Sequence, residues 1–316
     1  MRLLYLLIPL GLLAAVPFLR PLLEPRKPDE AVILAAYAEP LPAPEGPLRV
    51  YHLGHSLVGR DMPAMLAQLA PDGHGYESQL GWGTSLNEHW LGGDAINGFE
   101  AENAHPRYRD AKEAIGSGEY DAVVMTEMVE LKDAIRYHHS ARALHRWADL
   151  ARKSGPDTRI FLYETWHHLD DTDGWLQRLD SDLPDLWESQ LILPELALAD
   201  APERPIYLIP AGQVMASFVR KVEEAGGIGN VTDRESLFAR TDEGAVDTIH
   251  VNDIGAYLVA LTHYAVLYQQ DPTGLPFALA RADGTPAAAP DAIAARAMQE
   301  TVWEVVRTTR MTGMPR

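Results

Sequence analysis

The chain has 316 residues, no cysteine, and 45 acidic against 27 basic residues, which gives a formal net charge of −18. The absence of cysteine excludes disulfides, thiolate metal sites, iron–sulfur clusters and cysteine nucleophiles. So acidic a protein repels phosphate backbones, and nucleic acid is therefore not an expected partner. The hydrophobic fraction of 47% and the charged fraction of 23% are ordinary for a globular protein with a substantial core.

An uncharged apolar run covers residues 3–19, close to the shortest length that crosses a bilayer as a helix. No clear small-residue cleavage site follows it. We therefore predict that residues 1–20 anchor an exported protein in a membrane. The alternatives are a signal peptide, which leaves a secreted or periplasmic protein after cleavage, and a buried helix of a cytosolic protein. By the positive-inside rule, however, the basic residues that follow the run would place the rest of the chain on the cytoplasmic side.

Residues 21–47 contain seven prolines and are predicted to form a partly extended linker. After residue 48, short apolar runs alternate with amphipathic stretches. This alternation predicts one α/β domain over residues 48–316, with a mainly parallel five-stranded sheet and helices on both faces. The predicted strands are residues 48–53, 76–80, 121–126, 158–165 and 205–210. The predicted helices are residues 61–70, 109–116, 135–154, 175–198, 212–225, 252–269 and 290–308.

A serine stands just beyond the first predicted strand, in the run Gly54-His55-Ser56. In an open α/β sheet, ligands bind at the carboxyl ends of the strands, so the hydroxyl of Ser56 is expected in the crevice. Serine is also among the preferred residues for capping a helix N-terminus. Ser56 taken alone therefore fits a helix cap as well as a reactive group.

Asp247 and His250 are three residues apart on a predicted loop that leads into the helix at 252. From one turn, the carboxylate can accept the imidazole Nδ1–H and leave Nε2 free to take a proton. A serine hydroxyl needs such a base to become a nucleophile. An isolated Asp-x-x-His pair is more typical of a helix cap or a surface hydrogen bond, because the spacing is common by chance, so the interpretation depends on the pair meeting Ser56.

Together, these motifs resemble the SGNH (GDSL-like) hydrolase superfamily over residues 48 to about 269. The resemblance implies a flavodoxin-like three-layer α/β/α sandwich. It also implies that Ser56, Asp247 and His250 form a catalytic triad. His55 occupies the position where the family commonly has Asp or Asn.

The resemblance further implies an oxyanion hole made by the Ser56 N–H, a glycine N–H after the second strand and an asparagine side chain after the third. Gly83 fits the glycine best, and Gly81 is the alternative. The asparagine is missing, because Thr126 and Glu127 follow the third strand. Thr126 is then the candidate donor, and Glu127 can serve only if it is protonated or turned away. Loss of one such donor costs roughly a hundredfold to a thousandfold in rate.

Four side chains at strand ends are candidates for the substrate pocket: His55, Glu127, Trp166 and His167. The adjacent histidines His167 and His168, with aspartates after them, are residue types that suit zinc or manganese. Neighbouring histidines rarely bind one ion, however, and the His-Glu-x-x-His arrangement is absent. We therefore expect neither a metal nor a cofactor.

The expected function is hydrolysis of O-acyl esters of a carbohydrate or a lipid by a serine esterase that is tethered to a membrane through its N-terminal segment. An acyltransferase on the same residues is one alternative. A degenerate glycan- or lipid-binding domain without activity is another, because of the missing asparagine.

Overall fold

The computed structural model describes residues 26–315, so the predicted anchor at residues 1–20 lies outside the described residues. Between residues 26 and 315, no helix is both long and apolar enough to cross a membrane. A short helix, α2 (Glu30–Ala36), lies within the segment predicted as a linker. Its Ile33 is buried in one of the two cores of the domain, so this part of the segment packs on the domain.

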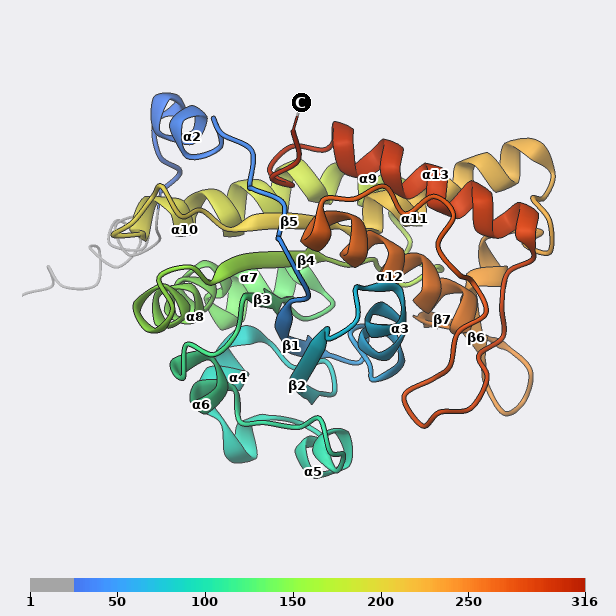
Figure 1. Cartoon of the computed structure of the whole chain (residues 1–316), viewed down its shortest axis with the longest axis horizontal. Coiled ribbons are helices and arrows are strands. Elements are labelled where there is room, and N and C mark those ends of the chain that lie inside the picture. The colour runs from blue at the N-terminus through green and yellow to red at the C-terminus, as the bar shows by residue number, and fades with distance from the viewer. Residues whose placement is uncertain (1–25, 316) are drawn as a thin grey trace, which may run out of the picture.

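Five parallel strands form the central sheet in the order β2-β1-β3-β4-β5 (Figure 1). This flavodoxin-like order reverses direction between β1 and β3, and the carboxyl ends of the strands at that point are where α/β proteins bind ligands. The prediction of an α/β fold with a five-stranded parallel sheet is confirmed. The strands are β1 (Arg49–His55), β2 (Gly75–Gly81), β3 (Ala122–Met125), β4 (Arg159–Glu164) and β5 (Tyr207–Pro210).

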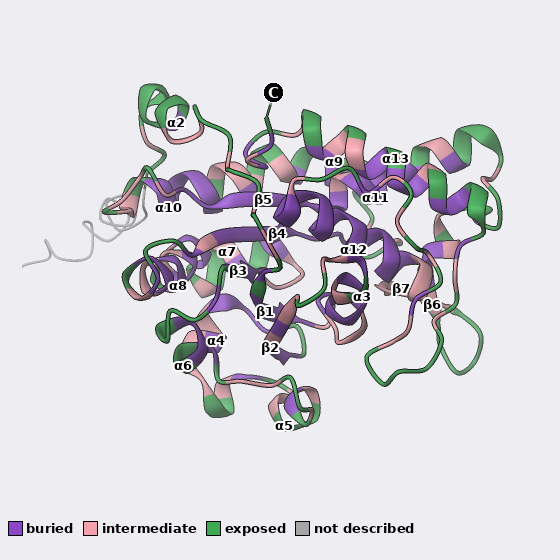
Figure 2. Ribbon diagram, viewed as in Figure 1, coloured by how far each residue is buried: buried purple, intermediate pink, exposed green. Residues whose placement is uncertain are grey.

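Helices cover both faces of the sheet, and Figure 2 shows the buried strands between them. Alternate strand residues point to opposite faces. Val50 and Val124 accordingly belong to one core, and Tyr51 and Val123 belong to the other. The first core is closed by α3 (Asp61–Leu69), α9 (Trp175–Asp182), α11 (Ala211–Ala225), α12 (Asp253–Tyr268) and α13 (Ala292–Thr308). The second is closed by α4 (Leu86–Leu91), α6 (Ala111–Gly116), α7 (Leu131–His138), α8 (Ser140–Ser154), η2 (Leu183–Ile192) and α10 (Leu193–Leu198).

Two predicted helices differ in detail from the observed ones. The prediction of one helix over 135–154 is wrong, because α7 ends at His138 and the next residue, His139, has a left-handed backbone with φ 53°. The helical stretch 175–198 is continuous, but its middle, η2, is π-helical. Pro184 and Pro194 have no N–H to donate, so the regular hydrogen-bond ladder of an α-helix cannot run unbroken through this stretch. The shorter segments η1 (Gly93–Ala95), α5 (Phe99–Asn103) and η3 (Arg234–Leu237) lie in the connections.

An antiparallel ribbon outside the main sheet is not predicted by the residue pattern. It consists of β6 (Phe238–Arg240) and β7 (Val246–Val251). The prediction that Asp247 and His250 lie on a loop is wrong, because both belong to β7. Every residue of β7 is half-buried. Its sequence, Val-Asp-Thr-Ile-His-Val, lacks the alternation of apolar and polar residues by which a half-buried strand is recognised.

Candidate active site

Ser56, His250 and Asp247 form one chain of hydrogen bonds at the carboxyl edge of the sheet. Nε2 of His250 lies 3.0 Å from the Ser56 hydroxyl, and Nδ1 lies 2.8 Å from Oδ2 of Asp247. Because a carboxylate only accepts, Nδ1 carries the proton and Nε2 is the acceptor for the serine hydroxyl. The arrangement can therefore remove a proton from Ser56.

The turn after β1 presents Ser56. The N–H groups of Val58 and Gly59 both donate to the carbonyl of His55, at 2.9 and 3.3 Å, which folds the chain back directly after the strand. Helix α3 begins only at Asp61, and the residue at its N-cap is Arg60. Ser56 therefore does not cap this helix, and its hydroxyl is available to His250.

Backbone hydrogen bonds orient Asp247 on β7. Its Oδ1 accepts from the N–H groups of Ile249 and His250, both at 3.0 Å. Partial burial opposes ionisation of Asp247, but the N–H groups of His250 and Ile249 and the His250 ring outweigh it and lower the pKa of this carboxyl group. Asp247 is thus held as a carboxylate that faces the imidazole.

A cleft of about 480 Å³ opens over these residues. Ser56 and His250 lie in its wall, together with Trp82 and Gly83 from the turn after β2 and His167 from the turn after β4. A second hollow of about 400 Å³ also includes Ser56, on the side of α3 and α12. A group held at Ser56 therefore has space on two sides.

Two backbone N–H groups in the cleft are free to receive an anion. Within residues 26–315, neither the N–H of Ser56 nor that of Gly83 donates a hydrogen bond to the protein. Gly83 has a left-handed backbone with φ 53°, and a Cβ there would meet only open space. A Cβ on Gly81, by contrast, would lie 2.3 Å from Oγ1 of Thr84, so this alternative glycine is enclosed.

The structure does not bring Thr126 to the cleft. Thr126 is fully buried, its hydroxyl donates to the carbonyl of Glu127 at 3.4 Å, and it is not among the residues that line the cleft. A Cβ on Gly54 would come within 2.5 Å of the Thr126 methyl group, so Thr126 packs closely behind the end of β1. Its observed contacts are those of a packing residue.

The Glu127 side chain is buried and directed away from the cleft. Oε1 of Glu127 accepts from the N–H groups of Leu86, at the start of α4, and Met128. Burial raises the pKa of this carboxyl group to about 7, against the effect of these hydrogen bonds. Glu127 therefore places no carboxylate in the cleft wall, because its side chain points toward α4.

Two buried histidines hold the strand ends behind Ser56. The ring of His55 accepts from the N–H of Leu57 at 3.3 Å and donates through Nε2 to the Glu127 carbonyl at 2.9 Å. His89, on α4, donates through Nε2 to the Gly54 carbonyl at 2.8 Å. Burial lowers the pKa of each ring to about 4, so both are neutral at pH 7. His55 also lines the cleft, whereas His89 does not.

Of the two candidates after β4, His167 lines the cleft and Trp166 is buried behind it. The indole N–H of Trp166 donates to the Ile249 carbonyl at 2.7 Å. Nε2 of His167 lies 2.9 Å from Oδ2 of Asp182. Trp166 therefore supports β7, and His167 belongs to a charged group at the cleft wall.

Arg178 on α9 is the centre of this charged group, and the sequence pattern does not single it out. Its guanidinium bonds to Glu130, Asp171 and Asp182 at distances of 2.7 to 3.1 Å, although only 4% of its side chain is exposed. These bonds lower the pKa of all three carboxyl groups, in part against desolvation. Glu130 and Asp171 line the cleft, so Arg178 fixes one side of it.

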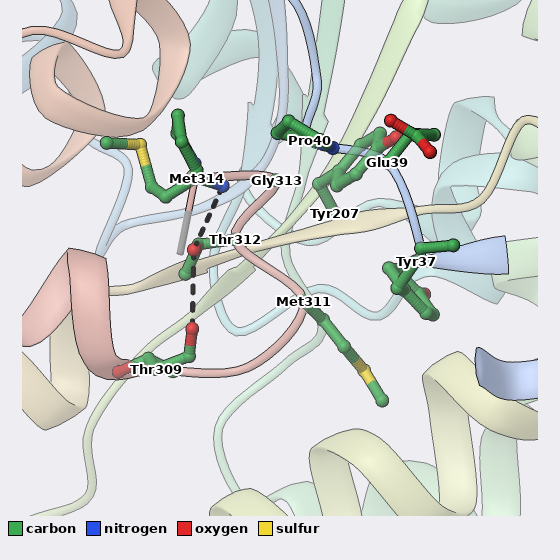
Figure 3. A pocket seen from close by; sticks show the side chains of 11 residues that line it. Tyr37, Glu39, Pro40, Tyr207, Thr309, Met311, Thr312, Gly313 and Met314 are labelled. Carbon is green, nitrogen blue, oxygen red and sulfur yellow. Dashed lines mark hydrogen bonds between the residues drawn. The ribbon is translucent and has the colours of Figure 1, made fainter. Parts of the chain in front are cut away.

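A further hollow, of about 240 Å³, lies between helix α2 and the C-terminal residues (Figure 3). Tyr207, the first residue of β5, is part of its wall, together with Tyr37 and Met311. It therefore lies at the amino end of β5, opposite the edge where α/β sheets bind ligands. None of the candidate site residues lines it.

No family model and no curated protein matches this sequence. Among the solved structures that match, a DUF4886 family protein from Bacteroides uniformis ATCC 8492 has a TM-score of 0.52 at 14% identity, over 85% of this chain and 99% of that chain. This similarity shows a shared fold. A protein provisionally assigned as a GDSL-like lipase, from Parabacteroides merdae ATCC 43184, has a TM-score of 0.43 at 12% identity over 71% of this chain and 96% of its own.

A carbohydrate esterase family 2 enzyme with a carbohydrate binding domain, from Corynascus thermopiles (Myceliophthora fergusii), has a TM-score of 0.29 at 12% identity. It covers 54% of this chain and 57% of its own.

Proposed function

We propose that the protein is a serine esterase of the SGNH (GDSL-like) type that hydrolyses O-acyl esters. The observation that carries this proposal is the 3.0 Å contact between Nε2 of His250 and the hydroxyl of Ser56, with Asp247 on the other ring nitrogen. A serine, a base and an orienting carboxylate in hydrogen-bonding sequence are the parts that nucleophilic acyl transfer requires.

In the proposed reaction, His250 takes the hydroxyl proton while the Ser56 oxygen bonds to the ester carbonyl carbon. The bond from this carbon to the alcohol oxygen then breaks, and His250 gives its proton to that oxygen. Water, deprotonated by His250, attacks the acyl-enzyme, which releases the carboxylic acid and restores Ser56. Asp247 keeps the imidazole in the required tautomer and stabilises its protonated form.

The N–H groups of Ser56 and Gly83 are the proposed oxyanion donors, because both lie in the cleft and neither is used within the described chain. Stabilisation of the negative charge that develops on the carbonyl oxygen is often the largest single contribution to such a reaction. Two donors without the asparagine side chain predict a slower enzyme, by roughly a hundredfold to a thousandfold, but the same reaction.

A fluorophosphonate probe, which reacts covalently with activated serines, tests the proposal directly. We expect the wild type and Ser189→Ala to be labelled, because Ser189 lies on η2 outside the cleft. Ser56→Ala should not be labelled. If folded wild-type protein resists labelling, the serine is not activated and a non-catalytic glycan- or lipid-binding domain becomes the better proposal.

An acyltransferase would use the same residues, with a sugar hydroxyl in place of water. The cleft is open to solvent at His250, whose side chain is 45% exposed, and this favours hydrolysis. Adding an alcohol acceptor to the assay and measuring free acid against transferred ester separates the two reactions.

Export and membrane attachment through residues 1–20 are a separate proposal, which the apolar run at residues 3–19 supports. Deletion of residues 1–28 should leave a folded protein that stays in the supernatant, while the full chain sediments with membranes. If the shortened protein is misfolded, the segment is part of the core instead.

A further inference from the structure

An exposed tryptophan stands in the cleft beside the proposed oxyanion donor. Trp82 precedes Gly83 in the turn after β2, lines the same cleft as Ser56, and is 54% exposed. Ligand pockets are lined mainly by hydrophobic and aromatic side chains, so an exposed indole inside a cleft is a candidate ligand contact. Neither the triad nor the oxyanion hole requires an indole at this position.

The indole is held in place from two sides. Its Nε1–H donates to Oε1 of Glu102 at 2.6 Å, and its backbone N–H donates to the carbonyl of Asn97 at 2.8 Å. Gly98, with φ 67°, lies against the ring, because a Cβ there would come within 2.3 to 2.7 Å of three of its atoms. One face of the ring thus rests on backbone. A ring fixed in advance loses little conformational entropy when a ligand stacks on it.

The charges in the cleft restrict what can stack there. Glu102, Glu130 and Asp171 line it, whereas among residues 26–315 no lysine or arginine does so. Of the nearby guanidinium groups, that of Arg178 is already bonded to Glu130, Asp171 and Asp182, and that of Arg60 donates to the carbonyls of Ala101 and Glu102. Phosphate, sulfate and uronate groups would therefore meet repulsion. Hydroxyl groups, in contrast, can donate to the carboxylate oxygens.

The alcohol half of an ester has to lie on this side of Ser56. The proton that His250 takes from Ser56 must reach the departing alcohol oxygen, so that oxygen leaves next to the imidazole. His250 and Trp82 line the same cleft, whereas His250 is not part of the second hollow at Ser56.

From these contacts we propose that Trp82 is the stacking platform for an uncharged sugar ring, whose acyl ester Ser56 cleaves. This inference rests on the proposed esterase function and narrows its substrate class to O-acylated neutral carbohydrates. The apolar face of the ring packs on the indole, and ring hydroxyls bond to the carboxylates of the cleft wall. Trp82 is thus a specificity-determining residue.

The test compares wild type, Trp82→Ala and Trp82→Phe on O-acetylated xylo-oligosaccharides and on p-nitrophenyl acetate, which has no sugar ring. We expect Trp82→Ala to lower kcat/KM for the acetylated sugar about tenfold more than for p-nitrophenyl acetate, mainly through KM. Trp82→Phe, which keeps a flat aromatic face, should recover most of this loss. Equal losses on both esters would overturn the proposal.

The charge argument has its own test. Wild type should hydrolyse acetylated neutral xylo-oligosaccharides faster than acetylated oligogalacturonides, and this preference should narrow as salt screens the carboxylates. Faster hydrolysis of acetylcholine than of any acetylated sugar would overturn the proposal in favour of a site for a cationic alcohol, since an indole face also binds ammonium groups.

Fluorophosphonate labelling separates failure of this inference from failure of the esterase proposal. If the wild type is labelled at Ser56 but kcat/KM for the acetylated sugar does not depend on Trp82, only the proposed role of Trp82 is contradicted. If Trp82→Ala does not fold, binding of O-acetylated xylotetraose to Ser56→Ala and to Ser56→Ala/Trp82→Leu is measured by titration calorimetry, and we expect about tenfold weaker binding to the second variant. Undetectable binding to Ser56→Ala itself also overturns the platform.

Discussion

The indole N–H of Trp166 donates to the carbonyl of Ile249 at 2.7 Å, which joins the residue before His250 to the end of β4. The neighbouring bond from the Leu169 N–H to the Thr248 carbonyl, at 2.8 Å, joins the same two segments. A third contact, at 2.9 Å, joins Nδ1 of His168 to the hydroxyl of Thr248. The position of the imidazole over Ser56 thus depends on these contacts between β7 and the turn after β4, because β7 is not a strand of the main sheet.

Trp166→Phe keeps an aromatic ring and removes the donor, which leaves the Ile249 carbonyl unpaired. We expect about a tenfold loss of kcat on p-nitrophenyl acetate and a loss of about 1–3 kcal/mol in the free energy of unfolding. Trp187→Phe, in the opposite core on η2, is the matched control: it changes the same volume without touching β7. Equal kcat in both variants would contradict the role of Trp166.

Asp247→Asn should lower kcat by about three to four orders of magnitude, because an amide in place of the carboxylate no longer fixes the imidazole tautomer. Hydrolysis of p-nitrophenyl acetate measures this effect. Asp170→Asn, in the nearby turn but outside the cleft lining, serves as the control for loss of one negative charge. If the two variants lose activity equally, Asp247 acts only through the overall charge.

Thr126→Val should keep kcat/KM within about threefold of wild type, since the methyl group that packs on Gly54 is retained. A side chain that donates to the oxyanion would instead cost about a hundredfold or more. Steady-state hydrolysis distinguishes the two, once the unfolding transition shows that the core is intact. A hundredfold loss in a stably folded variant would identify Thr126 as a donor after all.

Arg178→Met should remove about 3–5 kcal/mol of unfolding free energy, because it leaves three partly buried carboxylates without their cation. The loss should shrink in acid, since these groups have lowered pKa values and the stability they contribute disappears as they are protonated. Urea unfolding of wild type and Arg178→Met at several pH values measures this difference in unfolding free energy. Arg220→Met breaks the exposed pair with Asp180 and should cost at most about 1 kcal/mol.

His52 is wholly buried on β1, and neither ring nitrogen has a hydrogen-bond partner within the part of the chain that the structure describes. Burial and the neighbouring His263 lower the pKa of His52 well below 6.5. Below pH 6.5, His52 is therefore protonated in the unfolded chain but stays neutral in the folded protein. The unfolding free energy should then fall with acidification, by up to about 1.4 kcal/mol per pH unit for this group. His52→Leu should be more stable relative to wild type at pH 5 than at pH 8. Parallel pH profiles of the two proteins would contradict this.

The sheet could be predicted because short strand-like runs alternate with amphipathic stretches, and the runs end at glycine, proline or polar residues. All five predicted strands are observed, each within two residues at either end. Parallel strands meet at one edge, so the predicted positions of Ser56 and Gly83 follow from the same pattern. The ribbon β6–β7 escaped prediction because the sequence of β7, Val-Asp-Thr-Ile-His-Val, does not alternate apolar and polar residues, although Asp247 and His250 were recognisable from their spacing.

The supporting residues could not be predicted because their roles depend on contacts between distant segments. Arg178 is one of several charged residues on an amphipathic helix, and only the fold brings Glu130 to it across 48 positions of sequence. In the sequence, Trp82 is simply an aromatic residue in a glycine-rich turn, and nothing there distinguishes it from a structural residue. Its exposure beside Gly98 and Glu102 becomes visible only in three dimensions.

His250 lies on a small ribbon that is held in place by contacts with the turn after β4 and is not part of the main sheet. Catalytic activity can therefore be lost without unfolding of the sheet. Every residue of β7 is only half-buried, and segments of this kind open before the whole domain does. On warming, hydrolysis should therefore cease several degrees before the sheet melts, and should return on cooling, as the local opening leaves the five strands intact.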